Sequence, residues 1–171
     1  MAEKSAEVVE STADREIVLT RLFDAPRRMV WEAWADPKQI VLWFGPKGFT
    51  TTIEEMDLWT GGVWKQVMHG PDGTDYPCES VFTEVVPHER LGYRLSGGKR
   101  GGLAVQFESM VTFADEGGKT RLTLRMVFPS AEARDQNVRE YRSIEGGEQT
   151  LQRLAEHLET CFAASAKGGV R

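Results

Sequence analysis

The stretch EQTLQRLAEHLETCF, residues 148–162, indicates how this chain folds. Its apolar residues recur at spacings of three and four, which is the period of one face of an α-helix. Most of the preceding chain has the shorter period of strands, and strands with one apolar face need a second layer to cover it. We therefore expect this helix to lie in a curved sheet and to leave a pocket between the two. The apolar residues of the stretch are Leu151, Leu154, Ala155, Leu158, Cys161 and Phe162.

Two adjacent glycines, Gly146 and Gly147, stand just before this stretch. A glycine in a helix interior is less favourable than alanine by about 1 kcal/mol. We expect a kink or a loop at the pair, over the mouth of the pocket, with the continuous helix beginning near Glu148.

Strand patterns occupy residues 16–23 and most of residues 50–128. The cleanest alternation is at the end of the second region, where Leu122, Leu124 and Met126 share one face. Turn sequences such as Gly70-Pro71-Asp72-Gly73 separate the strands, and such short connections imply antiparallel pairing.

Two short helical patterns, each preceded by a proline, lie between the first strand and the rest: Pro26 opens one and Pro37 the other. Helices that are segregated from strands are typical of the α+β class. The predicted architecture is a curved antiparallel sheet of about seven strands around a long C-terminal helix, with two short helices after strand one.

Length and composition indicate one domain. We expect the 171 residues to divide into a flexible lead-in (1–14), a single domain (15–163) and a flexible tail (164–171). A net charge of −5 without a basic run argues against nucleic-acid binding. No apolar run approaches the roughly 18 residues of a membrane span, and the N-terminus has no apolar signal region. Two widely separated cysteines indicate reduced thiols, so we expect a cytoplasmic protein.

Bulky apolar side chains supply the candidate ligand site. One interpretation is that they are simply core, and the other is that a subset lines an apolar cavity between sheet and helix. Tyr76 and Tyr93 could add a hydroxyl to such a cavity. The residues that we expect to bind a ligand are Trp43, Trp64, Met68, Tyr93, Phe107, Met126, Phe128, Leu151 and Leu154.

Catalytic residues are left unassigned, because the sequence has no recognisable catalytic signature. His69, His88 and His157 are scattered, without other ligands at metal-binding spacing, so we expect no metal. His69 would need a carboxylate or hydroxyl partner to act as an acid or base, and the sequence places none beside it. The glycine-rich segments read as hairpin loops rather than phosphate cradles, and no cofactor is expected.

Several motifs along the chain resemble one known superfamily. They are LFDAPRRMVWEAW (22–34), Asp36-Pro37, Trp43-Phe44-Gly45-Pro46, Asp57-Leu58, Gly61-Gly62-Val63-Trp64, MHGPDG (68–73), EVVPHERL (84–91), TRLTL (120–124) and residues 151–159. Together they resemble the SRPBCC superfamily, and within it the branch named for the C-terminal domain of the heat-shock protein 90 ATPase activator. The resemblance extends from about Arg15 to Phe162. It implies the helix-grip, pollen-allergen-like fold, with a cavity for hydrophobic ligands between sheet and helix.

Two positions depart from the pattern of that family. Trp59-Thr60 stands where members tend to have Arg-Pro, and Gly147 stands where many carry Trp or another large residue. The missing side chain at residue 147 would widen the pocket entrance.

Three functions follow from the residues and the resemblance. The first is a binding protein that holds a small hydrophobic or amphipathic ligand. The second is a co-chaperone-like module with a chaperone or other protein as its partner. The third is a cyclase or hydrolase that uses polar cavity residues. A homodimer is a further expectation, drawn only from how common dimers are.

Overall fold

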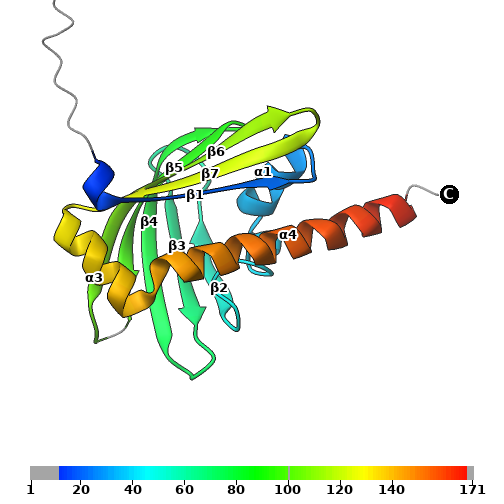
Figure 1. The fold of residues 1–171 in the computed structure, drawn as a ribbon. Helices are drawn as coiled ribbons and strands as arrows, with labels where there is room; N and C mark the ends of the chain where they lie inside the picture. Colours follow the sequence, from blue (N-terminus) through cyan, green and yellow to red (C-terminus); the bar gives the residue numbers. More distant parts are fainter. Residues whose placement is uncertain (1–11, 100, 169–171) are drawn as a thin grey trace, which may run out of the picture.

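The computed structural model describes residues 12–99 and 101–168. Seven strands form one antiparallel sheet in the order β1-β7-β6-β5-β4-β3-β2 (Figure 1). This sheet and the helices around it confirm the predicted α+β architecture. Residues 1–11 of the expected lead-in and 169–171 of the expected tail lie outside the described residues. The strands are β1 (Glu16–Phe23), β2 (Thr50–Met56), β3 (Val63–His69), β4 (Asp75–Val86), β5 (Arg90–Gly98), β6 (Ala104–Glu116) and β7 (Lys119–Val127).

Of the described helices, the two short ones after β1 and the long last one were predicted from the sequence. Two short ones follow β1, and a helix pair closes the chain and packs against β1 and α1 (Figure 1). In the ranges that the structure describes, no helix combines the length and hydropathy that a membrane crossing requires. The helices are the 3-10 turn η2 (Ala13–Arg15), α1 (Arg27–Ala35), α2 (Pro37–Ile40), α3 (Ala131–Tyr141) and α4 (Ser143–Gly168).

The glycine pair does not form the expected kink or loop. Gly146 and Gly147 lie inside α4, and the chain instead breaks at Arg142, whose φ is 49°. A Cβ at Gly147 would collide with the side chain of Leu19 in β1, and one at Gly146 would lie 3.2 Å from the ring of Pro46. The prediction was wrong because it weighed helix propensity alone. Close packing against β1 and against the loop after α2 offsets the cost of two glycines in the helix.

Sheet curvature is associated with two irregularities of strand register. The β2–β3 pairing shifts between Ile53 and Glu55, and the β4–β5 pairing shifts between Phe82 and Glu84. An extra residue on one strand bends it and increases its twist. The sheet therefore curves and presents a concave face to the helices.

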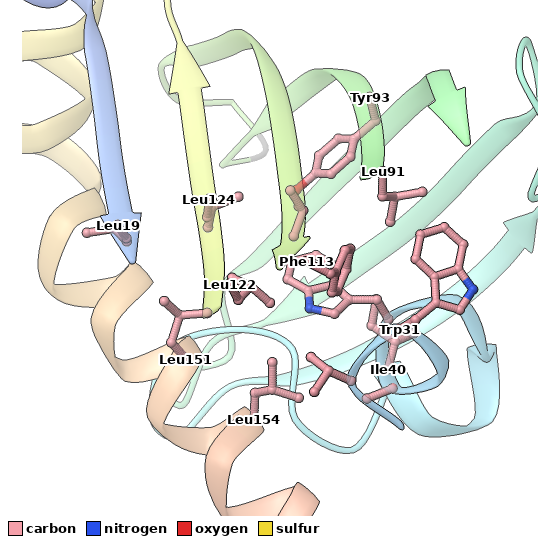
Figure 2. Packing of buried hydrophobic residues seen from close by; sticks show 14 of the residues in the cluster. Leu19, Trp31, Ile40, Leu91, Tyr93, Phe113, Leu122, Leu124, Leu151 and Leu154 are labelled. Atoms are coloured by element: carbon pink, nitrogen blue, oxygen red, sulfur yellow. The ribbon is translucent and has the colours of Figure 1, made fainter. Parts of the chain in front are cut away.

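The hydrophobic core fills part of that concave face. Leu122 and Leu124 of β7 are buried on the predicted face, and Leu151 and Leu154 of α4 are buried as well. In Figure 2, Leu151 and Leu154 point from α4 toward the Leu122 side of the sheet. The amphipathic helix thus closes on the sheet as its sequence predicts.

Candidate functional site

A cavity of about 360 Å³ lies between the concave sheet face, the loop after α2 and the two last helices. Ligand pockets typically measure about 300–1,000 Å³, so this volume suits a small ligand. Strands β3 to β7 form its walls, residues 44–49 form one rim and residues 137–150 form the other. Its aromatic and methionine residues are Trp34, Phe44, Phe49, Met68, Tyr76, Tyr93, Phe107, Met126 and Tyr141.

Four of the nine expected ligand-binding residues line this cavity. They are Met68, Tyr93, Phe107 and Met126, which come from four different strands. Side chains that alternate along neighbouring strands share one face of a sheet, and this brings the four together.

The other five expected residues lie outside the cavity lining. Trp43, Trp64, Leu151 and Leu154 are buried in the core instead. Trp43 donates from Nε1 to the carbonyl of Ala33 at 3.0 Å, and Trp64 stacks on Phe82 with ring centroids 5.7 Å apart. These contacts belong to the packed core rather than to the cavity lining.

Phe128 faces a second hollow, of about 450 Å³, between α3 and the neighbouring ends of β5 and β6. This hollow touches the main cavity at Val105 and Asn137, which line both. Phe128 is the one aromatic residue among the described residues of its lining, and most of the others are small or polar. The main cavity has the more typical composition of a ligand site.

Some lining residues were missed from the sequence. Phe49, Cys78 and Tyr141 come from a loop, from the middle of a strand and from the end of a helix. The strand period around Val81 and Phe82 does place Cys78 on the inner face, which was the available signal. For the loop and the helix end, no periodicity links their side chains to the sheet.

The described residues of the inner cavity wall carry no charged side chain. Burial raises the pKa of Tyr93 to about 12 and that of the Cys78 thiol to about 11, so both are neutral near pH 7. The thiol of Cys78 donates weakly to the carbonyl of Tyr76, at 3.6 Å. Within the part of the chain that is described, Glu140 and Arg142 are the charged lining residues, and both are exposed at the rim.

Two polar atoms of the lining lack hydrogen-bond partners among the described residues. Gln66, on β3, is only 3% exposed, and its Oε1 accepts no hydrogen bond. Trp34, on α1, is 1% exposed, and its Nε1–H donates none. Buried polar groups in folded proteins are nearly always paired, so each exception needs an explanation.

The rim of the cavity is held by specific hydrogen bonds. The Tyr141 hydroxyl donates to the carbonyl of Leu103 at 2.5 Å and accepts from the backbone N–H of Lys99 at 2.9 Å. These bonds tie the end of α3 to the loop between β5 and β6. Tyr141 also meets Tyr76 edge to face, with ring centroids 6.0 Å apart.

The opposite rim is tied to α4. Arg153 donates to the carbonyls of Gly45 and Pro46 at 3.0 and 3.1 Å, and Gln149 Oε1 accepts from the backbone N–H of Lys47 at 3.1 Å. Partial burial lowers the pKa of Arg153. The loop after α2 and the helix α4 therefore hold each other in place around the cavity.

Histidines are not part of the cavity lining as described. His69 lies between Asp75 Oδ1, 2.8 Å from its Nδ1, and Thr52 Oγ1, 2.9 Å from its Nε2. Neither partner was placed from the sequence, because Asp75 and Thr52 meet His69 only through the pairing of β3 with β4 and with β2. The neighbouring residue, Met68, lines the cavity, so His69 points to the other face of the sheet. Between residues 12 and 168, leaving out residue 100, no group of acidic, histidine and cysteine side chains is arranged to hold a metal ion.

The fold is shared with solved structures of proteins from several bacteria. A crystal structure from Mycobacterium smegmatis is 26% identical and superposes with a TM-score of 0.78, covering 91% of this chain and 98% of that one. A solution NMR structure from Arthrobacter aurescens is 25% identical, with a TM-score of 0.79 and coverages of 90% and 91%. A crystal structure from Nitrosomonas europaea is 26% identical, with a TM-score of 0.76 and coverages of 88% and 98%.

Comparison with curated protein sequences gave no match. The family model described as "Activator of Hsp90 ATPase homolog 1-like protein" matches residues 24–159, which is most of the chain. This match confirms the resemblance that the motifs indicated. The chain belongs to the Activator of Hsp90 ATPase homolog 1-like family of the SRPBCC superfamily.

Proposed function

We propose that this protein binds a small apolar or amphipathic molecule in the cavity between the sheet and the last two helices. The observation that carries the proposal is the cavity itself, about 360 Å³ in volume and lined chiefly by aromatic and apolar side chains. Sites for small molecules are concave and mostly apolar, with a few polar groups that orient the ligand. Met68 and Met126 add flexible side chains that adapt to ligand shape.

Native mass spectrometry of freshly purified protein tests the proposal most directly. We expect a co-purifying small molecule, or a rise in melting temperature with members of a library of small ring compounds. Val105→Phe would extend a side chain of the lining into the cavity and should reduce binding. Val81→Phe, at an exposed position on β4, is the matched control and should bind normally.

No co-purifying molecule together with a flat thermal-shift screen would count against the proposal. Equal loss of binding in the Val105→Phe and Val81→Phe variants would show that the effect is not local to the cavity.

A second candidate is a protein-interaction role, as the name of the family suggests. Trp59, in the loop between β2 and β3, is 62% exposed, and tryptophan is enriched at the energetic centres of protein interfaces. If this role holds, the protein should stimulate the ATPase of an Hsp90-type chaperone, and Trp59→Ala should weaken the stimulation. Leu42→Ala, at a similarly exposed apolar side chain, is the control.

A further inference from the structure

Gln66 is the most unusual residue of the cavity. Gln66 lies in the middle of β3, between Trp64 and Met68, whose side chains face the same side of the sheet. It pairs with Cys78 across the β3–β4 ladder. Its side chain faces the cavity and is buried, and no hydrogen bond to its Oε1 comes from the described residues.

A buried amide oxygen without a partner destabilises the folded protein, because it has lost its hydrogen bonds to water. An apolar residue of similar size would avoid that cost. A ligand with a hydrogen-bond donor at its inner end would satisfy Gln66, and the side-chain amide can also donate.

Within the described part of the chain, Trp34 supplies an unpaired hydrogen-bond donor, whereas Gln66 supplies an unpaired acceptor. Its Nε1–H is a donor without a partner among the described residues, and the residue also lines the cavity. A hydroxyl group both donates and accepts, so a hydroxylated ligand carries the donor that Gln66 Oε1 lacks and the kind of acceptor that Trp34 Nε1–H lacks in the residues described.

The absence of charge on the described inner wall limits the charge that a bound ligand can carry there. The charged residues of the described lining are exposed at the rim, and the Tyr93 and Cys78 groups are neutral near pH 7. A carboxylate or an ammonium group moved to the inner end would lose its hydration without gaining an opposite charge.

We infer that the ligand is a small, uncharged ring compound with a hydroxyl at its inner end, and that Gln66 binds this hydroxyl. The inference rests on the proposed function and specifies the chemical class of the ligand. The aromatic walls supply flat surfaces for the ring, and Gln66 fixes which end enters first.

Three probes of nearly the same shape test this inference: 2-naphthol, 2-methylnaphthalene and 2-naphthoate. Binding is measured near pH 7 by quenching of tryptophan fluorescence and by calorimetry. The wild-type protein should bind 2-naphthol about tenfold more tightly than 2-methylnaphthalene, since the methyl group cannot pair with the amide. It should bind 2-naphthoate most weakly of the three.

Gln66→Met keeps the length of the side chain and removes the amide. This variant should lose the tenfold preference for 2-naphthol and keep its affinity for 2-methylnaphthalene. Gln106→Met makes the same change at an exposed position on β6 and should keep the preference.

The outcomes separate the inference from the proposed function. If none of the probes binds the wild-type protein, the inference about a ring compound is refuted, while the proposed function is still decided by native mass spectrometry and the thermal-shift screen. If 2-naphthol and 2-methylnaphthalene bind the wild-type protein equally, the cavity binds ligands but the inference is refuted. If the Gln66→Met variant still binds 2-naphthol more tightly than 2-methylnaphthalene, another group binds the ligand hydroxyl and the role of Gln66 is refuted. The comparison within the wild-type protein stands even if a variant fails to fold.

Discussion

Replacing Gln66 by methionine should make the ligand-free protein more stable. The side chain is 3% exposed and its Oε1 accepts no hydrogen bond from the described residues, so the substitution removes a desolvated polar atom without breaking a bond to it. An unsatisfied buried acceptor costs about 1–3 kcal/mol. Since Gln66 borders a cavity rather than packed core, we take the lower end, about 1 kcal/mol.

A stabilisation of about 1 kcal/mol corresponds to a rise in melting temperature of about 2–4 °C for a chain of this size. The assay is urea and thermal unfolding of protein that was unfolded and refolded to remove any bound molecule. Gln106→Met, at an exposed position, should change the free energy of unfolding by less than about 0.5 kcal/mol.

A loss of stability in Gln66→Met of 1 kcal/mol or more would refute the reasoning. It would mean that the amide makes a stabilising interaction in the ligand-free protein. Gln66 would then be a structural residue, and its burial would give no information about a ligand.

Three further predictions concern the scaffold around the cavity. Thr120→Val should destabilise the protein by about 1–2 kcal/mol in urea unfolding, because the buried Thr120 hydroxyl donates to the carbonyl of Ala25 at 2.7 Å. Ser130→Ala should cost about 1 kcal/mol in the same assay, because Ser130 caps the N-terminus of α3. Alkaline pH should also destabilise the protein, because burial raises the pKa of Cys78 to about 11 and that of Tyr93 to about 12. The unfolded state therefore loses these two protons at lower pH than the folded state does. The free energy of unfolding should fall as pH rises from about 9 to 12.

Each of these has a result that would contradict it. Thr123→Val, at a hydroxyl in an exposed pair with Thr20, is the control for Thr120 and should cost less. An equal cost would argue against a special role of the buried bond. Unchanged helix content and stability in Ser130→Ala would argue against the cap. For the pH series, Cys78→Ala should reduce the loss of stability between pH 9 and 11, and an identical loss in this variant would show that other groups titrate.

The order of the elements and the faces of the regular ones could be read from the sequence. The alternation around Leu122 and Leu124 and the helical stripe with Leu151 and Leu154 each follow from a fixed backbone period. Such periods are local, because they depend only on the residue spacing within one strand or one helix. The fold class and the closing helix were therefore predictable.

Only the tertiary structure decided which apolar side chains are packed and which border the cavity. Trp43 and Phe44 are adjacent in sequence, yet Trp43 is core and Phe44 lines the cavity. The extent of α4 is a second case, since Gly146 and Gly147 are helical through contacts with Pro46 and Leu19 that lie far away in the chain. The physical reason is the same in both cases. Periodicity determines which way a side chain points, whereas close packing depends on the shapes of all the elements that meet there.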